Sequence, residues 1–156
     1  MKKSKGRMIF CITLLVINIG FIWVNSLLPR EISSAFSKLV GRIISIFFPS
    51  DVVVDAGEGH GILRKVAHFL EFCSLGVLLS CVAWMNRDKN LICILVPLIT
   101  GVAVAAVDET IQLFVPGRGP HIRDVGIDSA GVLLGVLLVW LLVYLKTNRI
   151  KGSAAQ

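Results

Sequence analysis

Polar side chains that could carry chemistry are concentrated in three short segments of an otherwise apolar chain. In the first segment, RKVAHFLEF, Arg64, His68 and Glu71 recur at intervals of four and three residues. These positions lie on one face of a helix. An imidazole beside a carboxylate can work as an acid/base pair or bind a metal ion, and an arginine can bind phosphate. We therefore predict one functional face here, with Lys65 beside it as a further cation.

The second segment, AVDETIQLF, places Asp108 and Gln112 four residues apart. The same helix face carries Gly101 and Ala105. Small residues allow a neighbouring helix to approach closely, so this face is predicted to be packed inward. Asp108 and Gln112 should then point toward the axis of a helix bundle, whereas Glu109 lies one step round the helix and is expected to be solvated.

The third segment, RDVGIDSAGVLLG, also combines polar and small residues on one helix face. Here the polar residues come first along the chain and the small residues follow. Asp124, Asp128, Gly131 and Gly135 share one helical stripe. The two glycines form a small-xxx-small motif, which is weak evidence alone but indicates which face is packed. Both aspartates are therefore predicted to face the same interior.

The connection FVPGRGPHIRD joins the second and third segments and carries Arg118 and Arg123. Its prolines and glycines predict a loop without regular structure. Arginine is suited to bidentate binding of carboxylate or phosphate. Together, the three segments and the loop predict one outward-open polar pocket. Its candidate catalytic residues, if the chain is an enzyme, are His68, Glu71, Asp108 and Asp124; its candidate ligand-binding residues are Arg64, Lys65, Glu109, Gln112, Arg118, Arg123 and Asp128.

The composition indicates that helices in a membrane position these residues. The chain of 156 residues is 55% hydrophobic and only 17% charged, with a mean hydropathy of +0.81. These values exclude a disordered chain and an ordinary cytosolic domain. The net charge of +6 does not indicate nucleic-acid binding, because the cations lie at the ends of apolar runs rather than on a soluble basic face.

About 20 apolar residues are needed to cross a bilayer as a helix, and four stretches meet or approach this length. We predict an all-α integral membrane bundle, a single domain over residues 1–156, with spans at residues 8–28, 66–84, 91–107 and 125–145. Basic clusters place both termini in the cytoplasm. The first span is expected to be retained as an anchor rather than cleaved. Residues 39–48, LVGRIISIFF, are predicted to form a short interfacial helix in the first outer loop.

The three motifs resemble those of the VanZ-like family of small bacterial membrane proteins. That family's pattern is Arg-Lys-x-x-His-x-x-Glu, then Asp-Glu-x-x-Gln followed by Pro-Gly-Arg, then Asp-x-x-x-Asn/Asp with glycines. Residues 64–135 match every position, with Asp128 where many members have asparagine. The resemblance implies a multi-pass protein of the bacterial cytoplasmic membrane. Because the family's namesake is linked to low-level teicoplanin resistance, it also implies a role at the cell envelope and in antibiotic resistance.

Two functions remain open, and we favour the first. The pocket could bind a lipid-linked cell-wall precursor or a glycopeptide antibiotic, in contact with membrane lipids and without a cofactor. Alternatively, the chain could be an acid/base or metal-dependent enzyme acting on such a lipid, with a divalent metal at His68, Glu71, Asp108 and Asp124. A structural role in an envelope complex is a third hypothesis. The sequence leaves the oligomeric state and the metal undecided.

Overall fold

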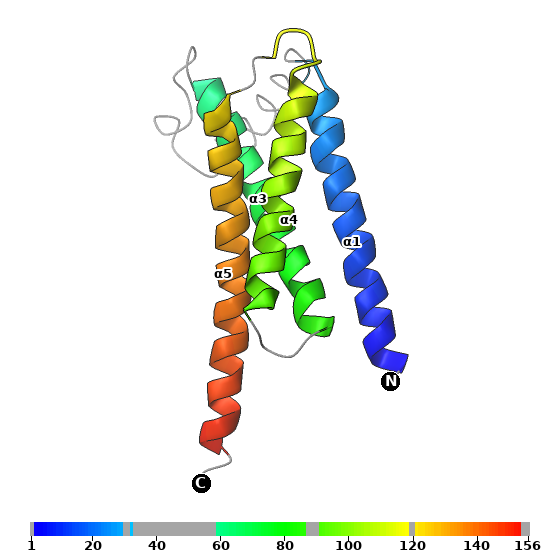
Figure 1. Ribbon diagram of the computed structural model, residues 1–156, viewed down its shortest axis with the longest axis vertical. Helices are drawn as coiled ribbons and strands as arrows, with labels where there is room; N and C mark the ends of the chain where they lie inside the picture. The colour runs from blue at the N-terminus through cyan, green and yellow to red at the C-terminus, as the bar shows by residue number, and fades with distance from the viewer. Residues whose placement is uncertain (1, 30–31, 33–58, 87–90, 119–120, 154–156) are drawn as a thin grey trace, which may run out of the picture.

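The computed structural model describes residues 2–29, 32, 59–86, 91–118 and 121–153, and within these ranges the chain is helical and contains no strand. The helices are α1 (Lys2–Leu27), α3 (Gly59–Asn86), α4 (Ile92–Gln112) and α5 (Ile122–Ser153) (Figure 1). All four are long and apolar enough to cross a membrane. The prediction of an all-α, four-span bundle is confirmed. The predicted interfacial helix at residues 39–48 lies outside the described residues.

The segments that are long and apolar enough to span a membrane include more of the polar motifs than the sequence predicted. They run over Lys5–Leu27, Arg64–Met85, Ile92–Gln112 and Ile122–Arg149. The last three extend past the predicted bounds at the polar ends because a helix satisfies its own backbone hydrogen bonds whatever its side chains are. The helix α4 also continues through the buried Pro97 instead of ending there.

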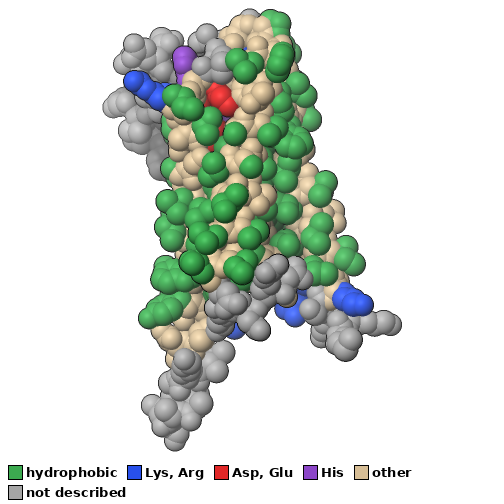
Figure 2. Space-filling view, viewed as in Figure 1, with side chains coloured by type: hydrophobic (Ala, Val, Ile, Leu, Met, Phe, Trp, Pro, Cys, Tyr) green, Lys and Arg blue, Asp and Glu red, His purple; other side chains and the backbone are tan. Residues whose placement is uncertain are grey.

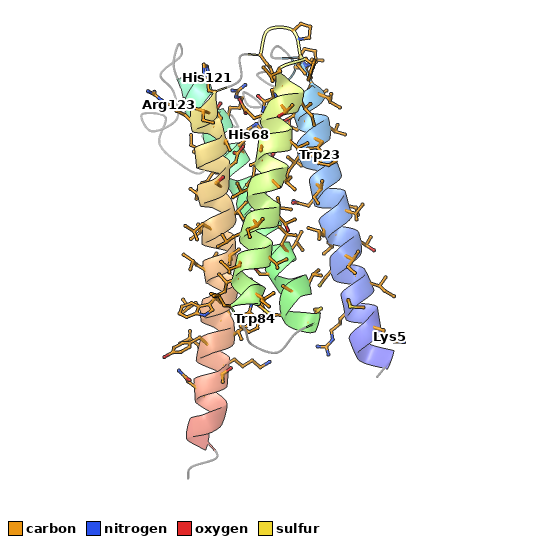
Figure 3. The ribbon with its side chains drawn as sticks, in the orientation of Figure 1. Lys5, Trp23, His68, Trp84, His121 and Arg123 are labelled. Carbon is orange, nitrogen blue, oxygen red and sulfur yellow. The ribbon has the colours of Figure 1, made fainter. Side chains whose placement is uncertain are left out.

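The first and last helices bring both termini to the same end of the bundle (Figure 1). Lys5 lies near that end, whereas His68, His121 and Arg123 lie toward the opposite end (Figure 3). The polar motifs are therefore separated along the bundle axis from the chain termini.

Glycines join α3 and α5 in the most extensive helix–helix contact of the described chain. A methyl group added to Gly131 would meet the carbonyl oxygen of Phe69, and one added to Gly135 would meet that of Cys73. Close backbone approach at small residues is a common way for membrane helices to associate. This contact fixes the relative rotation of α3 and α5, and with it the direction of the polar residues one and two turns away.

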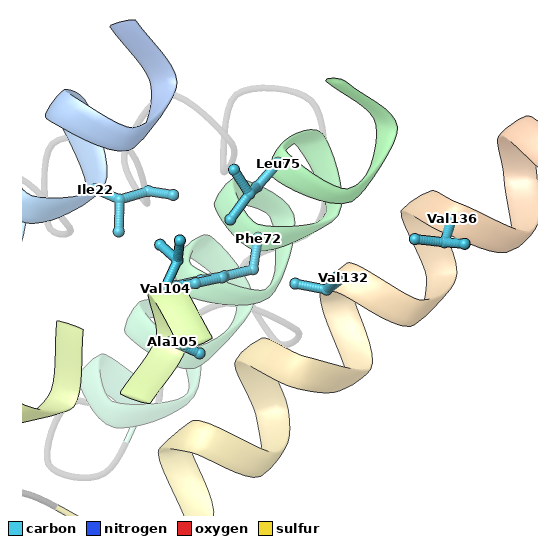
Figure 4. Packing of buried hydrophobic residues seen from close by; sticks show 7 residues of the cluster. All are labelled: Ile22, Phe72, Leu75, Val104, Ala105, Val132 and Val136. Carbon is cyan, nitrogen blue, oxygen red and sulfur yellow. The ribbon is translucent and has the colours of Figure 1, made fainter. Parts of the chain in front are cut away.

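A buried apolar cluster fills the middle of the bundle (Figure 4). Its members come from all four helices: Ile22, Phe72, Leu75, Val104, Ala105, Val132 and Val136. Helix α1 contributes least, since only 6% of the residues in its apolar window are buried. Leu15, Ile19 and Trp23 of α1 are partly buried and pack against this cluster. Other large apolar side chains of α1, such as Phe10 and Val16, are exposed on the outside, where a bilayer would contact them.

Candidate functional site

A polar pocket lies between α3, α4 and α5 toward the end of the bundle opposite the termini. It is lined by Arg64, Lys65, His68, Gln112, Asp124, Ile127 and Asp128, and it has about 250 Å³ of space, counting the part open to the outside. Acidic side chains are visible at this end of the molecule among apolar ones (Figure 2). The structure therefore brings residues of all three sequence motifs together in one pocket.

An ion pair links α3 and α5 at the rim of the pocket. Arg64 Nη2 lies 3.6 Å from Asp124 Oδ2, and the two side chains are 26% and 16% exposed. This separation is longer than a strong charge-assisted hydrogen bond. Arg64 therefore keeps donors available for a ligand, and Lys65, which is exposed, stands next to it.

Deeper in the bundle, one side chain from each of α3, α4 and α5 converges on the same point. His68 Nδ1 is 4.0 Å from Asp128 Oδ1, and donor atoms of His68, Asp108 and Asp128 all lie within 4.8 Å of one another. The three residues are 8%, 0% and 2% exposed. Buried carboxylates at this spacing repel each other unless a proton or a cation lies between them.

Gln112 connects this group to the first helix. Its amide nitrogen donates to Asp108 Oδ2 at 3.0 Å and to the hydroxyl of Ser26 at 3.4 Å. Ser26, on α1, is fully buried. The other carboxylate oxygen of Asp108, Oδ1, has no hydrogen-bond partner among the described residues. One side of the Asp108 carboxylate is thus fixed by Gln112 and the other is left available.

Arg118 lies in the turn after α4 and is buried against α1. Its Nη2 donates to the backbone oxygen of Asn25 at 2.9 Å. Burial, and then repulsion from Arg64, lower the pKa of the Arg118 guanidinium below its ordinary value. The preceding residue, Gly117, has a φ of 77°, a conformation that favours glycine. This turn places Arg118 inside the bundle, where its charge acts on Asp108.

Glu71 and Glu109 lie in the bundle but, like Asp108, do not line the pocket. Glu71 turns toward α1, where its Oε1 accepts a hydrogen bond from the amide of Asn25 at 3.1 Å. The expectation that Glu109 is solvated is wrong: Glu109 is only 7% exposed. The backbone N–H of His121, just before α5, donates to its carboxylate.

The arginines of the loop are separated by the structure. Arg118 is buried, whereas Arg123 belongs to the first turn of α5, is exposed, and points away from the bundle (Figure 3). Arg123 is not among the residues that line the pocket. The two arginines are only five residues apart, but α5 begins at Ile122, and its first turn directs Arg123 to the outer surface.

Sequence reasoning missed the contribution of α1. Asn18 donates to the hydroxyl of Ser74 at 2.8 Å, and Asn25 and Ser26 contact Glu71 and Gln112, as described above. A signal was available, because Asn18, Ile22 and Asn25 recur at helical spacing on one face of an otherwise apolar span. Such polar residues inside a membrane segment usually face other helices.

The arrangement offers two chemically different zones. The rim has cations that can bind an anionic group, and the deeper zone has an imidazole and two carboxylates that can exchange protons or bind a hard or borderline metal ion. Residues 8–143 of the chain match the family model described as VanZ/LLP1. No curated protein and no solved structure matches the chain.

Proposed function

The chain belongs to the VanZ/LLP1 family, and we propose that its pocket binds the phosphate-bearing headgroup of a lipid-linked cell-envelope precursor. One observation carries the proposal: the adjacent cations Arg64 and Lys65 line the same pocket. A phosphate needs several convergent donors, and these two side chains supply them where a lipid could approach from the bilayer.

The geometry of the rim favours an anionic headgroup with an apolar tail. Arg64 is held by Asp124 at 3.6 Å, which orients the guanidinium while leaving part of its fork for a ligand. Ile127 lines the pocket as its apolar member. Exposed apolar side chains such as Leu70 and Ile122 lie on the helices that form the pocket, so a lipid tail could remain in contact with the protein surface.

The same proposal includes an orientation in the bacterial cytoplasmic membrane. Lys5 and Arg7 on α1, and Lys146 and Arg149 on α5, belong to the end that carries the termini. Because Lys and Arg are enriched on the cytoplasmic side of membrane proteins, both termini would be cytoplasmic. The pocket would then face outward, where lipid-linked precursors and glycopeptide antibiotics meet. Binding of either molecule there would contribute to tolerance of teicoplanin.

The binding proposal can be tested with a matched pair of lipids. Purified full-length protein in nanodiscs would be titrated with a polyprenyl phosphate and with the corresponding polyprenol, which lacks the phosphate. We expect clear preference for the phosphate. The double variant Arg64→Gln, Lys65→Gln should weaken binding by about tenfold or more, because a hydrogen bond to a charged group contributes about 1.5–3 kcal/mol.

Arg123→Gln is the control for that experiment, since it removes a cation from the same end of the bundle but outside the pocket lining. It should leave the affinity unchanged. Equal binding of the polyprenol, or an equal loss in the control variant, would show that the pocket does not bind the phosphate.

A second candidate function is catalysis on such a lipid, by acid/base or metal-dependent chemistry. The approach of His68 to two buried carboxylates on different helices favours it, because imidazole–carboxylate pairs are common acid/base catalysts. Mass spectrometry of a polyprenyl diphosphate incubated with the protein distinguishes the two functions. A binding protein would return the lipid intact, whereas an enzyme would return a product that the His68→Gln variant does not form.

A further inference from the structure

The group formed by His68, Asp108 and Asp128 has the composition and spacing of an incomplete metal-coordination sphere. One nitrogen donor and two oxygen donors come from three different helices and lie within 4.8 Å of one another. Two donors on opposite sides of one ion at about 2.2 Å are about 4.4 Å apart. Small side-chain rotations would therefore bring all three donors to bonding distance of a single ion.

One carboxylate oxygen of this group receives no hydrogen bond from the residues that the structure describes. Asp108 is fully buried, and its Oδ1 has no partner within the described parts of the chain, although Oδ2 is bonded to Gln112. The 4.0 Å separation of His68 and Asp128 is too long for a hydrogen bond. A buried carboxylate oxygen without a partner is costly, so this geometry points to a bound cation that the three residues share.

The nearby arginines are not bonded to the two aspartates of this group within the described residues, and the buried Nε and Nη1 of Arg118 have no hydrogen-bond partner there. Arg64 pairs with Asp124 at the rim, and the Nη2 of Arg118 is bonded to the backbone of Asn25. The charge of Arg118 acts on Asp108, but no hydrogen bond joins these two side chains in the described residues. Neither buried aspartate therefore has a directly bonded cation among the described residues.

We propose that His68, Asp108 and Asp128 bind one divalent transition-metal ion, Mn²⁺ or Zn²⁺. Imidazole nitrogen suits zinc and carboxylate oxygen suits manganese, whereas Cu⁺ prefers the thiolate or thioether ligands that this group lacks. Gln112 acts as the outer-sphere partner that orients Asp108. This set shares His68 and Asp108 with the set predicted from sequence, but Asp128 takes the place of Glu71 and Asp124, which are bonded to Asn25 and paired with Arg64.

The remaining coordination positions would face the pocket, since His68 and Asp128 both contribute to its lining. The metal site does not depend on the proposed lipid ligand, because all three of its protein ligands are internal to the bundle. A metal ion bound there would nevertheless explain how a pocket with acidic side chains at its base can accept an anionic group.

Metal binding can be measured directly on the full-length protein. The purified chain would be stripped with a chelator, dialysed against MnCl₂ or ZnCl₂, and analysed by inductively coupled plasma mass spectrometry. We expect about one ion per chain. The variant Asp108→Asn, which keeps the side-chain shape, should weaken binding on the order of 100-fold, because outer-sphere partners alone are worth 10–100-fold.

Asp124→Asn is the matched control, because Asp124 lines the same pocket but pairs with Arg64. This variant should retain about one ion per chain. Circular dichroism of each variant would establish that the helices are formed. As a readout that needs no variant, the stripped wild-type chain should decrease the electron paramagnetic resonance signal of free Mn²⁺ when the ion is added.

Two results would overturn the metal site. One is a folded wild-type chain that retains no Mn²⁺ or Zn²⁺ and leaves the resonance signal unchanged, which would indicate that a proton compensates the two aspartates. The other is an equal loss of metal in the Asp108 and Asp124 variants, which would indicate non-specific binding. Neither result depends on the polyprenyl phosphate titration, so failure of the lipid-binding proposal would be recognised separately.

Discussion

Helices α3 and α5 associate in a different way from α1 and its neighbours. Between α3 and α5, glycines bring the backbones into direct contact at Gly76, Gly131 and Gly135. Helix α1 contains Gly20, but a methyl group added there would meet nothing within 4 Å. The first helix is joined instead by polar side chains, with Asn18 bonded to Ser74 and Asn25 bonded to Glu71.

Backbone packing at glycines and hydrogen bonds between polar side chains position different parts of the site. Lipid is as apolar as leucine, so membrane helices gain little by hiding ordinary apolar side chains from it. Close backbone packing fixes α5 on α3, and this sets the distance between His68 and Asp128. Hydrogen bonds then attach α1 at the level of the polar site, where Asn25 and Ser26 complete the surroundings of Glu71 and Gln112.

The largest effect is expected at the glycine contact. Gly135→Ala should lower the free energy of unfolding by about 2 kcal/mol or more, because the added methyl group would overlap the carbonyl oxygen of Cys73 and force the helices apart. Unfolding of the purified protein by a denaturing detergent, followed by circular dichroism, would measure the change.

Gly20→Ala is the matched control on the other helix, since the new methyl group would enter open space. Its stability should stay within about 0.5 kcal/mol of the wild type. A loss as large as that of Gly135→Ala would mean that α1 is packed as tightly as α5, and the contrast between the two contacts would disappear.

A smaller effect is expected where α1 meets the carboxylate of Glu71. Asn25→Ala removes the hydrogen bond to Glu71 Oε1, and the other oxygen, Oε2, has no partner among the described residues. The loss should be about 1 kcal/mol in the same unfolding measurement. Glu71→Gln retains an acceptor for Asn25 and should cost less; a greater loss in that variant would indicate that the charge of Glu71 matters more than this bond.

The smallest effect is expected at the partly exposed contact between Asn18 and Ser74. A double-mutant cycle with Asn18→Ala and Ser74→Ala should give a coupling energy of about 0.6 kcal/mol, the average for hydrogen bonds between membrane helices. A coupling energy larger than that between Asn25 and Glu71 would mean that the contact between Asn18 and Ser74 is the stronger of the two. The main attachment of α1 would then lie away from the polar site.

The helical spans and the faces that carry polar residues could be predicted because both are local properties. Periodic spacing placed Asp108 and Gln112 on the buried face of α4, and Asp128 with the packed glycines of α5. Glu109 could not be predicted in the same way. Its carboxylate accepts a hydrogen bond from the backbone N–H of His121, just before the next helix, and no periodicity encodes this contact.

By itself, the sequence determined an all-helical membrane chain with three polar motifs, because apolar length and helical periodicity act within each segment. Only the tertiary structure decided which of these side chains meet. It grouped His68, Asp108 and Asp128, directed Glu71 to α1, and separated Arg118 from Arg123. The physical reason is that such meetings depend on the rotation and depth of whole helices against one another, which packing across the bundle sets.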